Sequence, residues 1–114
     1  MSDCIFCKII KGEIPSKKVY EDDKVYAFYD IDAKAPVHVL IVPKVHIPSV
    51  NELNENNVSV LPYVMLAAKK IAKDLNVDKG GYRIVINTGK DAGQTVPHIH
   101  FHMLGGRDLA WPPG

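Results

Sequence analysis

The sequence has little cysteine, almost no net charge and no long apolar run. No apolar stretch approaches the ~20 residues that a membrane-spanning helix needs, so we expect no membrane partner. A formal net charge of +1 provides no positive field that would attract nucleic acid. The start of the chain lacks the basic and apolar regions of a signal peptide, and we therefore expect no structural disulfide between its two cysteines. These absences favour a cytoplasmic protein.

What the sequence does contain is typical of one globular domain. Of its 114 residues, 46% are hydrophobic and 24% are charged, which is an ordinary balance. A chain of this length has room for one hydrophobic core. It contains no repeat, low-complexity tract or internal linker, so we expect a single domain over residues 1–114.

Short apolar and β-branched segments predict the strands of an antiparallel sheet. The first two segments flank Asp22-Asp23 and predict a hairpin, and the third is an apolar run that stops at Pro43. The fourth follows the turn residues Gly80-Gly81. These strands are residues 18–21, 25–30, 38–42 and 82–87.

Two further segments predict helices. Residues 5–10 predict a short helix capped by Asp3. Residues 58–75 predict a long helix, in which Pro62 is tolerated if Ser59 is the cap, because the first turn needs no amide donors. We expect an α+β fold: an antiparallel sheet of about five strands, one long helix on its face and a short N-terminal helix. The apolar stripe of the long helix is Val58, Leu61, Met65, Ala68, Ile71, Ala72 and Leu75.

Three of the five histidines alternate with apolar residues in the segment 98–102. If this segment is a strand, its side chains alternate between the two faces, and all three imidazoles project to one side. Ile99, Phe101 and Met103 then point into the core. The alternative is a polar strand face on which histidine merely recurs.

The chemistry of such a row favours a division of labour over a single metal site. Same-face neighbours on a strand lie ~6.6 Å apart and do not converge on one ion. A central imidazole is instead suited to attack a phosphorus atom, while a flanking one donates a proton to the leaving group. The preceding loop carries two glycines, and Thr95 and the loop amides are candidates to bind phosphate oxygens.

A Cys-x-x-Cys pair at the N-terminus predicts a second kind of site. Two thiolates and two imidazoles make a closed tetrahedral zinc site, and the candidate donors are Cys4, Cys7, His46 and one end of the histidine row. A redox motif is the rival interpretation, although such a motif normally follows a strand. Two reduced thiols with no role are the third.

Several motifs together resemble the histidine triad (HIT) family. Residues 98–104, His-Ile-His-Phe-His-Met-Leu, resemble its His-φ-His-φ-His-φ-φ signature, in which φ is apolar. The resemblance extends over nearly the whole chain and is greatest to the branch called histidine triad nucleotide-binding proteins, whose members typically end in Trp-Pro-Pro-Gly. The other matching segments are 4–10, 35–38, 43–46, 89–95 and 111–114.

The resemblance implies an activity, a partner and a cofactor. Such proteins are homodimers whose two sheets join into one, and they hydrolyse purine nucleoside phosphoramidates and related adenylated compounds. Zinc would be structural, held by Cys4, Cys7, His46 and His98, and no organic cofactor is expected. Dinucleoside polyphosphate hydrolysis, as in another branch, is one alternative, and the Trp-Pro-Pro-Gly ending argues against it. A purine-nucleotide-binding interaction protein with residual catalysis is the other.

The resemblance also assigns roles to individual residues. His100 would be the nucleophile that forms a nucleotidyl-histidine, His102 would contact the phosphate and assist the leaving group, and His38 would support the nucleophile. Thr95 stands where serine is common, which keeps the hydroxyl. Asp30 would accept the ribose hydroxyls, and an apolar trio would sandwich the base. The implied nucleotide-binding residues are Phe6, Phe28, Asp30, Ile31, Asn87, Gly93, Gln94, Thr95, His100 and His102.

Overall fold

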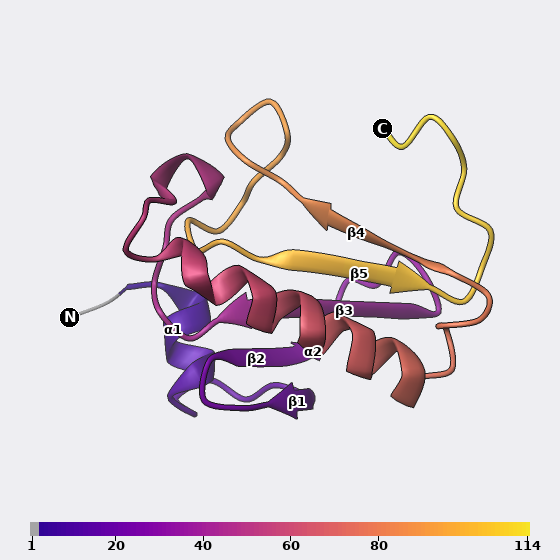
Figure 1. Ribbon diagram of the computed structural model, residues 1–114, viewed down its shortest axis with the longest axis horizontal. Coiled ribbons are helices and arrows are strands. Elements are labelled where there is room, and N and C mark those ends of the chain that lie inside the picture. Colours follow the sequence, from indigo (N-terminus) through magenta and orange to yellow (C-terminus); the bar gives the residue numbers. More distant parts are fainter. Residues whose placement is uncertain (1–2) are drawn as a thin grey trace.

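The computed structural model describes residues 3–114 and has the expected α+β architecture. Five antiparallel strands form one sheet in the order β1-β2-β3-β5-β4 (Figure 1). Within the described part of the chain, no helix is long and apolar enough to cross a membrane. The strands are Lys18–Glu21 (β1), Val25–Tyr29 (β2), Val37–Pro43 (β3), Tyr82–Ile86 (β4) and Phe101–Gly105 (β5). The helices are Ile5–Ile10 (α1) and Leu61–Asp74 (α2), with short 3₁₀ segments at Val50–Glu52 (η1) and Val58–Val60 (η2).

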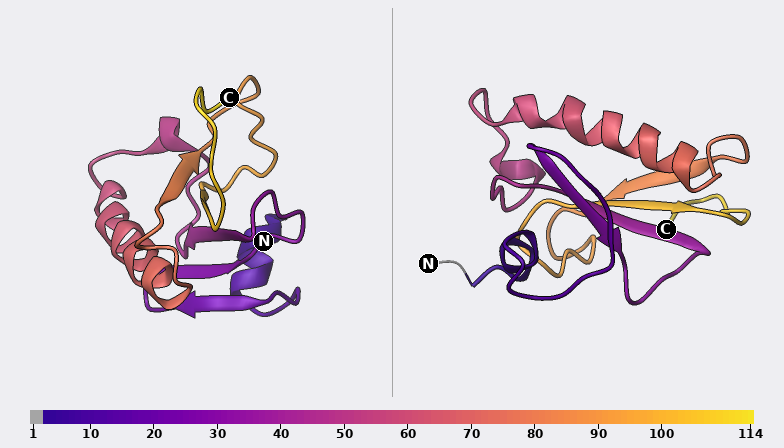
Figure 2. Two further views of the ribbon diagram at one scale, coloured as in Figure 1. Left: turned by 90° about the vertical axis from the view of Figure 1, so that its right-hand side faces the viewer. Right: turned by 90° about the horizontal axis from the view of Figure 1, so that it is seen from below.

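The two helices cover opposite faces of the sheet (Figure 2). Side chains alternate along each strand, so one strand contributes to both hydrophobic clusters. On β3, Val39 and Ile41 belong to the larger cluster that α2 covers, whereas Leu40 and Val42 belong to the smaller cluster around Phe6 of α1. The histidines described below lie on the α1 side.

The predicted hairpin is confirmed, and one carboxylate explains its turn. The Asp22 side chain accepts hydrogen bonds from the amides of Lys24 and Val25 at 2.8 and 2.9 Å. This arrangement replaces missing backbone bonds within the turn. β2 and β3 then pair from Val25↔Pro43 to Tyr29↔Val39.

The helix caps differ from those predicted. Cys4, not Asp3, is the N-cap of α1, and its sulfur accepts the amide of Cys7 at 3.5 Å. The long helix begins at Leu61 after the 3₁₀ turn η2, and its N-cap is Val60, so the predicted Ser59 cap is wrong. Pro62 occupies the first helical turn, where its missing amide costs nothing.

The buried face of the long helix was predicted only in part, because two residues of the predicted apolar stripe are exposed. Val58 and Met65 are 41% and 49% exposed, and the buried stripe instead includes Val64 and Ala67. Val58 belongs to η2, whose tighter winding takes it out of the helical stripe. The remaining buried residues of α2 are Ala68, Ile71 and Ala72.

The predicted histidine strand is the main departure in the sheet. β5 begins only at Phe101, so His98 and His100 precede the strand and only His102 lies within it. The segment before the strand is held by a different partner: the Ile99 amide donates to the Ile47 carbonyl at 2.6 Å. The expectation that Ile99, Phe101 and Met103 enter the core is confirmed, because each is 2% exposed or less.

Candidate functional site

Two histidines meet on neighbouring strands on the α1 face of the sheet. β3 carries His38 and β5 carries His102, and the strands pair with Leu40 opposite His102. His38 Nε2 lies 2.9 Å from His102 Nδ1. On the far side of its ring, His38 Nδ1 accepts the main-chain amide of Lys34 at 3.0 Å.

The amide of Lys34 determines where the protons of both rings lie. An amide can only donate, so His38 Nδ1 must be unprotonated and the neutral His38 ring carries its proton on Nε2. That proton is donated to His102 Nδ1, and neutral His102 therefore carries its own proton on Nε2. Asp30 Oδ2, 3.4 Å from His38 Nε2, favours the same arrangement. The chain of hydrogen bonds thus presents a donor at His102 Nε2.

Burial disfavours the charged form of these two rings. Desolvation lowers the pKa of His38, assisted by Lys34 and opposed by Asp30 and Asp32. The pKa of His102 is also lowered, first by burial and then by the neighbouring His100 and His38 rings.

His100 has the opposite proton arrangement. Its Nδ1 lies 2.8 Å from the main-chain carbonyl of His98, which can only accept, so Nδ1 donates and neutral Nε2 keeps its lone pair. The residue is 5% exposed, and the edge of the Phe6 ring packs against it at a centroid distance of 5.0 Å. The rings of His100 and His102 lie 5.1 Å apart. A nucleophilic nitrogen and a proton donor therefore belong to adjacent rings.

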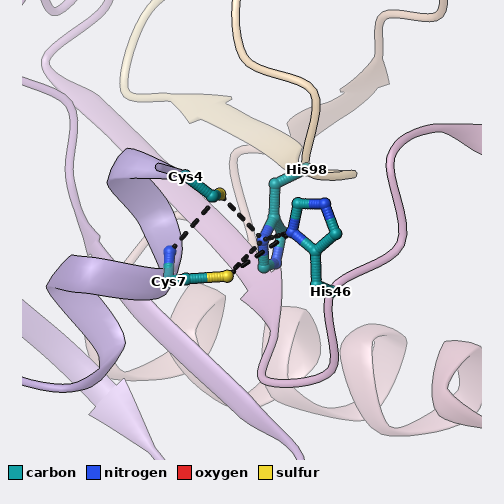
Figure 3. A group of neighbouring side chains, drawn as sticks. All are labelled: Cys4, Cys7, His46 and His98. Atoms are coloured by element: carbon teal, nitrogen blue, oxygen red, sulfur yellow. Dashed lines mark hydrogen bonds between the residues drawn. The ribbon is translucent and has the colours of Figure 1, made fainter. Parts of the chain in front are cut away.

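His98 is turned away from this pair and joins the thiols. Its Nε2 donates to the carbonyl of Pro43 at 2.8 Å, which leaves the lone pair on Nδ1. That atom lies 3.4 Å from Cys4 Sγ, 3.6 Å from Cys7 Sγ and 3.2 Å from His46 Nδ1 (Figure 3). Cys7 Sγ and His46 Nδ1 are 3.4 Å apart. The four donor atoms point toward one another from α1, the β3–η1 connection and the segment before β5.

These separations suit a tetrahedral metal ion. Bonds of about 2.3 Å to sulfur and about 2.05 Å to nitrogen place sulfur and nitrogen roughly 3.6 Å apart and two nitrogens roughly 3.3 Å apart. The measured distances of 3.4–3.6 Å and 3.2 Å agree with that geometry. The bond from His98 to the Pro43 carbonyl is the outer contact that a metal-binding histidine usually makes. These residues can hold a metal.

A second group, Asp30, His38 and His102, also brings three possible ligand atoms within 4.8 Å of one another. Its hydrogen bonds argue against a metal, however. A ligand nitrogen needs a lone pair, and the Lys34 amide forces His38 Nε2 to carry a proton. The hydrogen bonds of this cluster instead fix which ring nitrogens carry protons.

In the loop before the histidines, several polar groups already form hydrogen bonds within the protein. The Gln94 side chain donates to the carbonyls of Pro48 and Val96 and accepts the Gly89 amide. The amides of Gly93 and Gln94 donate to Lys90 and Gly89 carbonyls within the loop. Gly93 and Gln94 therefore shape the loop, and binding a phosphate with their amides requires these bonds to be exchanged.

Thr95 and the residues expected to bind the ribose and the base do not form a complete binding site. Thr95 is exposed and lines an open hollow beside Cys4, Cys7 and His46. Asp30 already accepts the Asp32 amide through Oδ1. Phe6 and Phe28 pack edge to face, 5.7 Å apart, while Ile31 is fully exposed, so no apolar slot is preformed between them. Asn87 is half-buried just beyond β4.

Two features of the site were not anticipated. His38 was expected to support His100, but its hydrogen bond is to His102. The main-chain groups of Lys34 and Pro43, which orient His38 and His98, were missed. Main-chain partners cannot be recognised from residue type. The only hint in the sequence was that Pro43 lies three residues before the candidate ligand His46.

Comparisons with known proteins agree with this architecture. A family model described as HIT domain matches residues 11–109, a range that includes all five histidines but neither cysteine. The chain is 50% identical over 115 residues to a "14 kDa zinc-binding protein" of Zea mays, covering 99% of this chain and 89% of that protein. It resembles the solved structure of a HIT family hydrolase from Legionella pneumophila with a TM-score of 0.95 and 46% identity, over 98% and 100% of the two chains. A HIT family hydrolase from Clostridium thermocellum is similar at TM-score 0.94 and 52% identity, over 96% of each chain.

The lowered pKa values predict a loss of stability in mild acid. Unfolded histidines keep a pKa near 6.5, so below about pH 6.5 the unfolded chain binds more protons than the folded one. For His38 and His102, stability is therefore fully present above that pH and falls as the pH drops below it. Urea unfolding at about pH 7 and about pH 5.5 measures this difference in unfolding free energy.

The matched comparison is His102→Asn, which removes one of the two groups. The variant should lose less stability than the parent over the same pH interval. Groups that do not contact His102 contribute equally in the two proteins, so an unchanged pH dependence would contradict the role assigned to burial of His102 and its bond to His38.

Proposed function

Because the chain belongs to the HIT family, we propose that it is a hydrolase of purine nucleoside 5′-phosphoramidates or adenylated compounds. The reaction would pass through a covalent nucleotidyl-histidine on His100. One observation carries the proposal: the His98 carbonyl holds the Nδ1 proton of His100, which leaves Nε2 as a nucleophile. The names of the similar solved structures support hydrolysis as the class of reaction.

In the first step, His100 Nε2 attacks phosphorus and the bond from phosphorus to the leaving nitrogen breaks. An amine is a poor leaving group unless it receives a proton as it departs. The proton on His102 Nε2 would be donated to it, and the pair of adjacent rings, 5.1 Å apart, supports this division of labour. His102 becomes negatively charged as this proton leaves, until water returns one in the second step. The N–H of His38 that donates to His102 Nδ1 would stabilise that charge.

In the second step, water cleaves the bond between phosphorus and His100. The oxygen of water bonds to phosphorus, one water proton returns to the His102 position, and the nucleoside monophosphate leaves. His100 regains its lone pair on Nε2, so the cycle is closed without an oxidant or a co-substrate other than water. His100 is buried and His102 is half-buried, which strengthens the electrostatic interactions that these steps use.

Nucleotide binding would involve the surface near this pair. Asp30 has an exposed edge on which ribose hydroxyls are proposed to bind. The base would pack near Phe6, Phe28 and Ile31, where the exposed Ile31 gains most from being covered. Asn87, Gly93, Gln94 and Thr95 are proposed for the phosphate, with loop rearrangement on binding. Phe6 and His100 are already in contact, which links base and phosphate regions.

We propose zinc as the metal of the Cys4, Cys7, His46 and His98 cluster. Mixed thiolate and imidazole donors in this number favour zinc, and the name of the Zea mays relative supports the choice. When bound, zinc would supply a structural cross-link between α1 and the segment before β5. The redox interpretation is weaker because both sulfurs face imidazole nitrogens that suit a metal.

Two other functions remain as alternatives. A dinucleoside polyphosphate hydrolase would use the same two rings, with a phosphate as leaving group in place of an amine. A nucleotide-binding interaction protein would retain purine affinity with little turnover. The donor on His102 Nε2 favours the phosphoramidate, because a phosphate leaving group depends less on protonation.

Replacing the nucleophile tests the proposed reaction. His100→Ala should reduce turnover of adenosine phosphoramidate by about a thousandfold or more, while the affinity for AMP largely survives. Steady-state kinetics and calorimetry measure the two quantities. In the parent, rapid quenching with labelled substrate should place the label on His100. Lys70→Ala, on the exposed face of α2, is the control and should resemble the parent.

The outcomes separate the three functions. Turnover of His100→Ala near the parent rate would refute the assignment of the nucleophile. A parent that cleaves diadenosine polyphosphates far faster than phosphoramidates would support the first alternative, and AMP binding without turnover of either would support the second.

Metal content tests the zinc proposal. Protein purified after zinc-replete growth should contain about one zinc per chain, and fewer than about half an equivalent would count against a structural site. His46→Ala should lose most of the zinc and melt at a lower temperature. His102→Ala should retain it, because His102 bonds to His38 and belongs to the separate group with Asp30. Equal loss in both variants would contradict the separation of the two clusters.

We also propose that a second copy of this chain pairs along β4. This strand is at the edge of the sheet and exposes Tyr82 and Ile86 by 36% and 41%. Edge strands offer unpaired backbone groups that another strand can satisfy. Light scattering in solution should then give about twice the 12.6 kDa of one chain. A mass of one chain at micromolar concentration would refute the homodimer.

A further inference from the structure

The connection from β2 to β3, residues 30–36, is clamped by an arginine from the other end of the chain. Arg107 follows β5, and its Nε and Nη2 both donate to the Lys34 carbonyl, at 3.2 and 2.8 Å. Its Nη1 donates to the Asp108 carbonyl at 2.8 Å, which anchors the guanidinium to its own turn. The connection itself is mostly exposed and so depends on such contacts for its conformation.

The turn that carries Arg107 packs closely against this connection. Gly106 has φ +91°, a conformation that favours glycine, and a side-chain carbon there would lie 3.0 Å from Pro36 Cβ. The next residues of the two segments, Val37 of β3 and Gly105 of β5, are paired in the sheet. The backbone therefore brings Arg107 over Lys34.

Lys34 is the first link of the hydrogen-bond chain that ends at the proton donor. Its carbonyl accepts from Arg107, and its amide donates to His38 Nδ1. If that amide moves away, Asp30 alone still favours the proton on Nε2, and a fraction of His38 is able to take its proton on Nδ1 and offer a lone pair from Nε2. His102 would then carry its proton on Nδ1, and its Nε2 would have no proton to donate.

We propose that Arg107 is a positioning residue, which holds the Lys34 amide on His38 and so keeps the proton of His102 on Nε2. It touches no reacting atom, and it acts only through Lys34 and His38. Its effect on turnover rests on the proposed function, whereas its effect on the imidazole protons does not.

The geometry of the clamp requires arginine. Only a guanidinium can place two donors on one carbonyl and a third on another with a single planar group. Arg107→Lys keeps the charge but has one ammonium for two carbonyls, so it should restore the clamp in part. Arg107→Ala removes it. Because the side chain is exposed, neither change removes core packing.

The first measurement observes the protons directly. Long-range proton–nitrogen correlation NMR distinguishes protonated from unprotonated ring nitrogens. The parent should show His38 with its proton on Nε2 and His102 likewise. Arg107→Ala should increase the fraction with Nδ1 protonated at both residues, and Arg107→Lys should give an intermediate fraction. Unchanged proton positions in Arg107→Ala would overturn the proposal.

The second measurement uses the chemistry of the leaving group. Arg107→Ala should slow formation of nucleotidyl-His100 from adenosine phosphoramidate about tenfold, a part of the 10²–10⁴ that general acids contribute. The nitrophenyl ester of AMP, whose leaving group needs no proton, should react at nearly the parent rate. Single-turnover quenching measures both rates. Equal losses with the two substrates would overturn the proposal, because they indicate a general structural defect.

Arg83→Ala is the matched control. Arg83 also donates to main-chain carbonyls, those of Leu109 and Ala110, but has no bond to Lys34. It should leave both the proton positions and the ratio of the two rates as in the parent. A shift as large as that of Arg107→Ala would contradict the specific link through Lys34. If the parent forms no nucleotidyl-histidine, the proposed function fails, and the NMR comparison still decides the role of Arg107.

Discussion

The hydrogen bond from His100 Nδ1 to the His98 carbonyl is the contact on which the site depends. It selects the ring nitrogen that keeps a lone pair, and it requires the backbone at His98 to stay in place. The side chain of the same residue is fastened between the Pro43 carbonyl and the two thiols. One residue therefore couples the Cys4, Cys7 and His46 cluster to His100, through its side chain on one side and its carbonyl on the other.

Much of the fold was predictable because local patterns and tertiary packing agree. Local pattern and packing favour the same structure in three places. These are the hairpin around Asp22, the apolar run of β3 and the helical spacing of α2. The errors lie where tertiary contacts override local signals. The histidine segment alternates like a strand, yet Ile99 bonds to Ile47 and the ladder with β3 begins only at Phe101.

The candidate site was predictable as a set of residues but not as an arrangement. Spacing and residue type predicted that a central imidazole works with a flanking one and that Cys4 and Cys7 join His46. The pairing of His100 with His102 came from the family resemblance. Spacing and residue type did not indicate that the Gln94 side chain would donate to the Pro48 and Val96 carbonyls, because these hydrogen bonds depend on the geometry of the loop. The positions of the ring protons are even harder to predict from the sequence, because they are determined by main-chain atoms that every residue has.

Those main-chain atoms explain how one kind of side chain presents different ring nitrogens to its surroundings. A carbonyl beyond the ring holds a proton and frees the opposite nitrogen, as at His98 and His100. An amide beyond the ring, as at His38, does the reverse and makes the opposite nitrogen a donor. The lone pair of His98 meets thiols and suits a metal, whereas that of His100 belongs to a ring beside a proton donor and suits phosphorus. The polarity of the main-chain partner thus determines which ring nitrogen keeps a lone pair, and so which chemistry each of the two histidine clusters is suited to.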